Sequence, residues 1–384
     1  MFDEVNISKA VDKIMKNYEE LNTYYITKVA HQIKLIGKLN PSSVNRIVLM
    51  TQWGSDIREI TAKIAEVVGV SVKQVMSLYQ KVLEDTFHDK RFAEALKHKE
   101  LTPRDVSRLN QFTQAVGRQT AGELVNLANT TVAEQTYRDA VDKAVLAVSS
   151  GLSDYKQATR DVIRDLGNSG LQVQYPSGYH KRLDSAVQQN IIDGTRQLAQ
   201  QTSDMMGQAL GYDAVEIVAH AMSAPDHEPI QGRVFLLSEF EKLQSEQSFT
   251  DIDGNTYGPI RRAIGQWNCR HSTNSFSTQY SKRMWSDAQL QDMADKNGQG
   301  CWIDGKHYTM YGVSQLMREL ETKARREKET AIAAQAAGDE ELRKECQMRL
   351  NAISKKYNEV CAISGLRSQW SIRADVEGFR ALKI

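Results

Sequence analysis

The sequence predicts a mostly α-helical protein with a small α+β module, in which long helices flank a compact, strand-containing centre. Two observations predict the helices. The chain has only six prolines in 384 residues, and its apolar residues recur at spacings of three and four over long stretches. A third observation predicts the module, because three of the six prolines, three of the eight histidines and one of the four cysteines lie between residues 216 and 272.

The composition argues against several classes of protein. A net charge of +1, from 49 basic and 48 acidic residues, is unlike a dedicated nucleic-acid binder whose whole surface is basic. No stretch approaches the roughly 18 consecutive apolar residues of a membrane span, and the acidic, amphipathic start lacks the layout of a secretory signal. Four scattered cysteines are too few for a disulfide framework, so we expect synthesis in a reducing cytoplasm.

Residues 1–170 are predicted to be a helical N-terminal region. The predicted helices cover residues 8–36, a segment that begins at Ser42 or Ser43, two helices joined at Gly69, a stretch that begins at Thr102-Pro103 and stays helical to Val148, and residues 154–166. The pair joined at Gly69 is typical of a packed helical hairpin. A DNA-reading helix-turn-helix is the less common alternative.

Residues 171–315 are predicted to form the α+β module, and residues 316–384 a C-terminal helical arm. The module would contain short strands near residues 171–175, 214–220 and 232–237, a long helix over residues 181–210, and a small core filled by Trp267 and Trp302. The arm reads as two long helices joined near Gly338. Its Glu and Arg side chains, such as Glu321 with Arg325, are typical of a solvated helix face.

Two motifs in the module resemble a known family. The segment AHAMSAPDHEPIQGRVF is followed, after a TYG turn, by NCRHS, and further on by DGKHYTMYGVSQLMRELETKARREK. In this order they resemble the phage minor capsid protein 2 family, within the group of phage Mu F-like head morphogenesis proteins. The resemblance covers roughly residues 175–375. One departure is Ala224, which stands where the family usually has an arginine before Pro-x-His.

The resemblance implies a structural protein of the virion, present in few copies, at or near the portal inside the head and acting in head assembly. It implies the portal protein, the major capsid protein or both as partners. The alternative is a head protein that binds packaged double-stranded DNA non-specifically and is ejected with it. We expect the N-terminal helices to serve assembly, so that a chain without residues 1–100 would remain folded but would not enter heads.

The same resemblance suggests a metal site. Mu F-like relatives carry Cys-x-x-Cys before the glycine turn and Cys-x-Cys after it, and His227, Cys269 and His271 stand at three of these four positions. Zinc accepts histidine and cysteine interchangeably in tetrahedral sites. His220 or Asp226 could supply the fourth ligand of a structural zinc ion. No other cofactor is expected.

Hydrogen bonding at a tight turn is the commoner alternative to zinc. Asp226 and Asn268 suit turns, Gly232 suits close approach of the backbone, and Arg270 could reach Asp226 or Glu216. In either case burial of the flanking apolar residues should gather the polar groups in space, since unpartnered buried groups are costly. The gathered residues would be His220, Asp226, His227, Gly232, Asn268, Cys269, Arg270 and His271.

Two further classes are weighed against this structural interpretation. The sequence contains no phosphate-binding glycine loop, nucleophile elbow or His-Glu-x-x-His helix, so we do not expect an enzyme. Phosphate contact is the other alternative, for which the candidate residues are Arg261, Arg262, Lys323, Arg325 and Arg326. Because acidic residues are interleaved with the last three, a solvated mixed face is the simpler interpretation.

Overall fold

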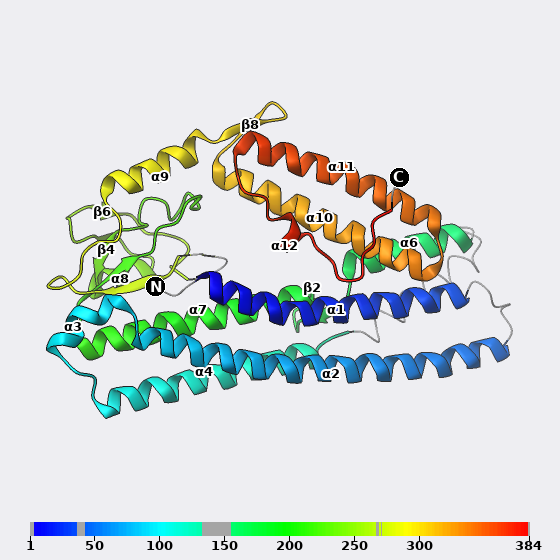
Figure 1. Ribbon diagram of the computed structural model, residues 1–384, viewed down its shortest axis with the longest axis horizontal. Helices are drawn as coiled ribbons and strands as arrows, with labels where there is room; N and C mark the ends of the chain where they lie inside the picture. Colours follow the sequence, from blue (N-terminus) through cyan, green and yellow to red (C-terminus); the bar gives the residue numbers. More distant parts are fainter. Residues whose placement is uncertain (1–3, 37–42, 133–154, 266–268, 270, 383–384) are drawn as a thin grey trace. The chain divides into compact units, whose positions relative to one another are not determined.

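The computed structural model describes residues 4–36, 43–132, 155–265, 269 and 271–382. Most of these residues are helical, with four small antiparallel sheets, which confirms the predicted fold class (Figure 1). The long helices are α1 (Glu4–Ile36), α2 (Ser43–Phe87), α4 (Pro103–Asn129), α6 (Tyr155–Ser169), α7 (Leu183–Leu210), α10 (Met310–Ala337) and α11 (Glu340–Ser364). No helix among the described residues is long and apolar enough to cross a membrane.

The chain divides into two compact units. Unit 1 comprises Met1–Lys9, Val75–Ala121 and Ile191–Gln315, and unit 2 comprises Ala10–Gln74, Gly122–Asn190 and Leu316–Ile384. Each unit therefore draws on segments that are far apart in the sequence. The predicted domains, by contrast, are three consecutive stretches of the chain with boundaries near residues 170 and 315. These boundaries stay predictions.

Two of the predicted helix boundaries are wrong. α2 runs without interruption through Gly69, where we had expected a joint between two helices. A glycine inside a helix costs only about 1 kcal/mol relative to alanine, so the regular apolar spacing on both sides outweighs it. The helix that begins at Pro103 ends at Asn129, where the predicted helical stretch was expected to continue, and residues 133–148 of that stretch lie outside the described residues. The expected breaks at residues 37–41 and 149–153 lie outside the described residues.

The two predicted helices of the C-terminal arm are confirmed as α10 and α11. Figure 1 shows them as an antiparallel pair. Gly338 takes the left-handed conformation that the turn requires (φ 78°), and the Asp339 side chain caps α11 by accepting a hydrogen bond from the amide of Leu342.

The predicted pairing of Glu321 with Arg325 on a solvated face is wrong. Glu321 is 3% exposed and accepts a hydrogen bond of 2.7 Å from the Tyr357 hydroxyl on α11. Arg325 instead lies 3.1 Å from Asp184 and 3.5 Å from Glu19. The periodicity of one helix does not reveal that α11 covers this face of α10.

A buried charge network holds unit 2 together around the predicted strand after residue 170, which is confirmed. This strand, β1 (Gln172–Gln174), pairs with β2 (His180–Arg182). Arg182 donates two hydrogen bonds to Glu329 and two to Asp184. Burial alone would raise the pKa of Asp184, but Arg182 outweighs burial and lowers this pKa to about 2. The network links β2, α7 and α10 through side chains that are mostly shielded from water.

The core of unit 1 includes residues from the predicted N-terminal helical region. One apolar cluster brings the end of α2, the 3-10 helix η1 (Lys90–Phe92), α3 (Ala93–His98) and α4 against α7 and the residues after it. Its buried members are Leu83, Phe92, Ala95, Leu109, Met206, Leu210 and Tyr212. Leu83, Phe92 and Ala95 lie within residues 1–100, so a chain that lacks these residues would lose part of this core. The expectation that such a chain stays folded remains a prediction.

A three-stranded sheet forms the centre of unit 1, in the order β4-β3-β7. The strands are β3 (Ala214–Ile217), β4 (Val234–Leu236) and β7 (Thr273–Phe276), and both neighbours pair with β3 antiparallel. β3 and β4 were predicted, whereas β7 was not. Every residue of β3 is buried. Gly207 of α7 packs against the side chain of Ser275 in β7, leaving no room for a β-carbon.

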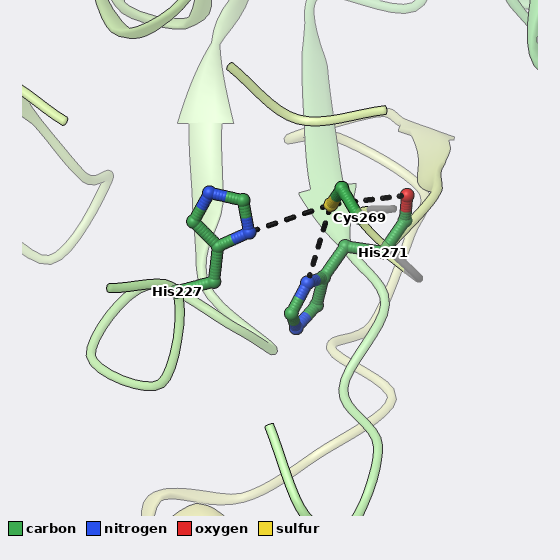
Figure 2. Close-up of side chains that lie close together, drawn as sticks. All are labelled: His227, Cys269 and His271. Atoms are coloured by element: carbon green, nitrogen blue, oxygen red, sulfur yellow. Dashed lines mark hydrogen bonds between the residues drawn. The ribbon is translucent and has the colours of Figure 1, made fainter. Parts of the chain in front are cut away.

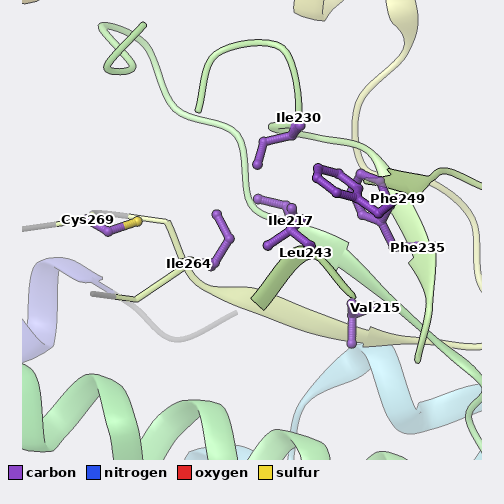
Figure 3. Packing of buried hydrophobic residues seen from close by; sticks show 8 residues of the cluster. All are labelled: Val215, Ile217, Ile230, Phe235, Leu243, Phe249, Ile264 and Cys269. Atoms are coloured by element: carbon purple, nitrogen blue, oxygen red, sulfur yellow. The ribbon is translucent and has the colours of Figure 1, made fainter. Parts of the chain in front are cut away.

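An apolar cluster on one side of this sheet shows how the module is filled (Figure 3). Its members come from β3, β4, the loops around them and the short elements α8 (Leu237–Gln244) and β5 (Phe249–Thr250). They are Val215, Ile217, Ile230, Phe235, Leu243, Phe249, Ile264 and Cys269. The sulfur of Cys269 therefore lies at the edge of an apolar core, next to polar groups described below.

The remaining strands of unit 1 form two hairpins. β5 pairs with β6 (Thr256–Tyr257), and β8 (Cys301–Ile303) pairs with β9 (Lys306–Tyr308) after helix α9 (Asp287–Gln299). A short helix, α12 (Trp370–Arg373), follows α11 in unit 2. The prediction that Trp302 fills a core is wrong, because Trp302 is 66% exposed on β8. Trp267 lies outside the described residues.

Candidate functional site

The loop between β3 and β4 carries the first motif, and backbone hydrogen bonds close it tightly. The amide of Val218 donates to the carbonyl of Ser272, and the amide of Gly232 donates to the carbonyl of Ile217. Gly232 has a φ of 68°, and a β-carbon there would lie 2.4 Å from the side chain of Leu290. The role of Gly232 in a close backbone approach thus follows from both its conformation and its surroundings.

His227, Cys269 and His271 meet at the base of this loop (Figure 2). The Cys269 sulfur lies 3.4 Å from Nδ1 of His227 and 3.6 Å from Nδ1 of His271. All three residues are buried, with exposed fractions of 3% or less. These are three of the four metal ligands that the sequence suggested, drawn from segments about forty residues apart.

The outer nitrogen of each imidazole faces an oxygen. Nε2 of His227 lies 2.6 Å from the carbonyl oxygen of Arg262. Nε2 of His271 lies 3.4 Å from Oε1 of Gln231 and 3.3 Å from Oγ of Ser223. Both rings are therefore held with Nδ1 directed at the sulfur of Cys269.

His220, the fourth suggested ligand, lies beside the group rather than in it. Its ring centroid is 4.3 Å from that of His271, with the two rings inclined by 30°. Its Nδ1 lies 3.0 Å from the carbonyl oxygen of Ala221. The structure thus places His220 against the back of His271, where it packs on the ring that contacts Cys269.

Asp226 forms an ion pair that the sequence did not predict. Arg262 donates to its two carboxylate oxygens at distances of 3.1 and 2.8 Å, and the carboxylate lies 3.7 Å from Nε2 of His227. The structure therefore brings His220, Asp226, His227, Cys269 and His271 together, with Gly232 closing the loop above them. Asn268 and Arg270 lie outside the described residues.

The pKa values in this group reflect burial and mutual contact. Burial, with the neighbouring His220, His227 and Arg262, lowers the pKa of His271 to about 3. Burial alone would raise the pKa of Cys269, but hydrogen bonds from His227 and from the amide of Gly265 outweigh it and hold this pKa below its usual value. Burial would lower the pKa of His227, and the contacts with Cys269, with the carbonyl of Arg262 and with Asp226 together more than offset that effect. Cys269 and His227 thus stabilise each other's charged forms.

Comparison with known proteins identifies the chain. The family model of phage minor capsid protein 2 matches residues 3–361. The chain belongs to the phage minor capsid protein 2 family. The resemblance noted in the sequence is thereby confirmed over nearly the whole length. No curated protein and no solved structure matched the chain.

Membership makes this a phage minor capsid protein, and so a component of the virion that contacts other virion proteins. The family is a structural one, which agrees with the expectation that the protein is not an enzyme. The group around Cys269 therefore belongs to a capsid protein. In a structural protein, a buried cluster of this kind is suited to stabilising the fold. Its polar members are arranged inward, toward one another.

The candidate phosphate-binding residues of the minor capsid protein lie in two different settings. Arg262 pairs with Asp226, Lys323 pairs with Glu319 at 2.6 Å, and Arg325 pairs with the acidic residues of unit 2. Arg261 and Arg326 are exposed. Acidic partners therefore accompany three of the five candidates, as the interleaved acidic residues suggested for the helix that carries Lys323.

Sequence reasoning missed several residues that support the cluster. Gln231 orients His271 and also accepts a hydrogen bond of 3.1 Å from the amide of His220. Asn297 of α9 is buried and donates to the Ser223 carbonyl and to the Glu228 carboxylate, bracing the loop from outside. Gln231 stands directly before Gly232 of the turn, and this position could have marked it as part of the site. Nothing in the sequence marks Asn297.

Proposed function

We propose that this minor capsid protein lies at or near the portal, inside the phage head, and acts in head assembly by binding the portal protein, the major capsid protein or both. The observation that carries the proposal is the family match over residues 3–361, which covers the helical segments as well as the motif-bearing module. The role is structural: the protein supplies docking surfaces rather than a reaction.

The β8–β9 hairpin supports this role as a docking element. Trp302 is 66% exposed there, and its ring lies 5.5 Å from that of His307. Lys306 lies over the ring of Tyr308. Exposed tryptophan is costly in water and is enriched at the energetic centres of protein interfaces. A hairpin with this side chain on its surface is suited to docking against another subunit of the head.

Cross-linking of purified virions tests the location. Lys306 is exposed on the same hairpin as Trp302 and offers an amine to a lysine-reactive cross-linker. We expect cross-links from this minor capsid protein to the portal protein or to capsid subunits that surround it. Protease treatment of intact virions should leave the chain uncut. Cross-links confined to tail proteins, or digestion in intact particles, would contradict the proposal.

A matched pair of variants tests the docking element. Trp302→Ala should leave the purified protein folded but reduce its incorporation into heads, because it removes an exposed aromatic side chain. Met348→Ala, which truncates another exposed apolar side chain (57%) on α11, is the control and should be incorporated normally. Equal incorporation of both variants would mean that the β8–β9 hairpin is not a docking element.

The second candidate function is binding of packaged DNA followed by ejection with it. The exposed Arg261 and Arg326 favour it, because arginines at a surface can neutralise phosphates. With few such residues, binding should be weak and should fall as salt increases. Analysis of particles after ejection separates the two functions: retention of the chain in empty heads supports assembly, and its loss supports ejection.

A further inference from the structure

We propose that His227, Cys269 and His271 bind one structural zinc ion through Nδ1, Sγ and Nδ1. The inference is independent of where the protein lies in the head. It rests on the spacing of the donor atoms, on the orientation of both imidazoles and on the chemistry of the three side chains.

The spacing of the donor atoms fits a tetrahedral zinc site. Zinc binds thiolate sulfur at about 2.3 Å and imidazole nitrogen at about 2.0–2.1 Å, so tetrahedral angles place sulfur and nitrogen about 3.6 Å apart. The two sulfur–nitrogen distances here are 3.4 and 3.6 Å. All three donor atoms lie within 4.8 Å of one another. Both sulfur–nitrogen distances therefore already match those around a tetrahedral zinc ion.

The orientation of the imidazoles shows which nitrogens carry protons. A neutral imidazole has one N–H donor and one acceptor nitrogen. Nε2 of His227 faces a backbone carbonyl, which can only accept, so Nε2 is the donor and Nδ1 the acceptor. For His271 the partners are Oε1 of Gln231 and Oγ of Ser223. The Gln231 oxygen also accepts from the amide of His220, and the Ser223 hydroxyl donates to the carbonyl of Ala224, so both oxygens are acceptors for Nε2 of His271. When both rings are neutral, as metal ligands are, both Nδ1 atoms thus present lone pairs to Cys269.

A single thiol cannot satisfy both of these lone pairs. If Cys269 holds the proton, its S–H group can donate to only one Nδ1; if His227 holds it, the thiolate has no proton for His271. In both cases at least one Nδ1 lone pair faces sulfur in a buried site. A cation at the centre accepts all three lone pairs at once. The arrangement also matches metal sites in general, where a ligating histidine donates its other N–H to a carbonyl or carboxylate.

The donor set and its surroundings favour zinc among the common metals. One thiolate and two imidazoles are ligands that zinc accepts, whereas calcium and magnesium require oxygen. The amide of Gly265 donates a hydrogen bond to the sulfur, which offsets part of the thiolate charge.

A zinc ion here would fasten two segments of unit 1 to each other. His227 belongs to the loop that follows β3, and Cys269 and His271 directly precede β7. The ion would close this end of the sheet as a disulfide would, without needing an oxidising compartment. Its effect is on the stability of the sheet rather than on any reaction.

Metal analysis and cobalt substitution of the full chain test the proposal. We expect about one zinc per chain by elemental analysis after expression with added zinc and removal of loosely bound metal. Cobalt(II) added to the metal-free protein should give the visible bands of a tetrahedral site and a thiolate-to-cobalt charge-transfer band. The charge-transfer band identifies a cysteine as a ligand without any substitution.

Variants assign the ligands. Cys269→Ser and His271→Asn should lose the zinc and the cobalt charge-transfer band. His220→Asn, beside the group, and Cys346→Ser, a buried cysteine elsewhere, should retain about one zinc per chain. Should Cys269→Ser fail to fold, thiol counting on the native wild-type protein replaces it: removal of zinc should expose one additional reactive thiol. Absence of the charge-transfer band in the wild-type protein, or full zinc content in a folded Cys269→Ser variant, would overturn the proposal.

Discussion

Replacement of Glu216 by glutamine should change how the stability of the protein depends on pH. Glu216 lies in the middle of β3 and is 3% exposed. Its Oε1 accepts a hydrogen bond of 2.7 Å from the amide of Met284. Burial raises the pKa of this carboxyl from 4.5 to about 7, although the Met284 amide and nearby arginines act in the opposite direction. Glutamine keeps an oxygen for Met284 but cannot ionise.

The magnitude follows from the two pKa values. A carboxyl whose pKa is higher in the folded protein than in the unfolded chain stabilises the fold fully below the unfolded value, near 4.5, where both states are protonated. That stability declines as the pH rises through the folded value of about 7. A difference of 2.5 units, at about 1.36 kcal/mol per unit, corresponds to about 3 kcal/mol. Relative to the wild type, Glu216→Gln should therefore gain up to about 3 kcal/mol between pH 4.5 and pH 8.

Urea denaturation at a series of pH values measures this gain. The difference in unfolding free energy between Glu216→Gln and the wild type should grow steadily up to about pH 7 and then level off. Glu100→Gln, which replaces an exposed carboxylate of the same unit, is the control and should show no such trend. Parallel pH profiles for Glu216→Gln and the wild type would refute the reasoning, because they would mean that Glu216 ionises normally in the fold.

The remaining predictions concern unit 2. Arg182→Met should lower the unfolding free energy by about 3–5 kcal/mol, because it leaves the buried carboxylate of Glu329 without its partner. Lys323→Met, at an exposed ion pair, should change it by less than about 1 kcal/mol, and similar losses would contradict the network. Gly167→Ala should destabilise the protein, since its β-carbon would meet the backbone of Thr330 at 2.6 Å, whereas Gly122→Ala has open space and should stabilise its helix by about 0.5–1 kcal/mol. Urea denaturation measures all four, and a stabilised Gly167→Ala would show that the contact with Thr330 is not tight.

Periodicity predicted the helices well because most of them bury one continuous apolar face. It failed where a local preference competed with that face. Gly69 was interpreted as a break, yet α2 passes through it. A β-carbon added at Gly69 would meet no atom within 4 Å, so the glycine lowers the stability of the helix only through its own backbone flexibility. Glu321 was read as solvated because the sequence of α10 alone does not show that Tyr357 of α11 lies over it.

The sequence predicted which residues form the candidate site better than it predicted the groups that these residues contact. Histidine and cysteine are few in this chain, so their concentration in two short segments marked the site. Their supports could not be predicted in the same way. The carbonyl of Arg262 is a backbone group that any residue would supply, and Gln231 is one of many glutamines. Pairing of Asp226 with Arg262 depends on how a loop folds back, which spacing along the chain does not determine.

The pairing of β7 with β3 explains why the two halves of the site meet at all. Ile217, the last residue of β3, stands opposite Thr273, the first residue of β7. In an antiparallel pair the chain that leaves one strand lies beside the chain that enters the other. The loop with His227 therefore emerges next to the segment with Cys269 and His271. A slip of one residue would turn the side chains of β7 to the opposite face and move the segment before it by about 3.4 Å, which would separate the sulfur of Cys269 from the imidazole of His227. The cluster and the strand register thus depend on each other, so contacts within the cluster favour one register over its neighbours.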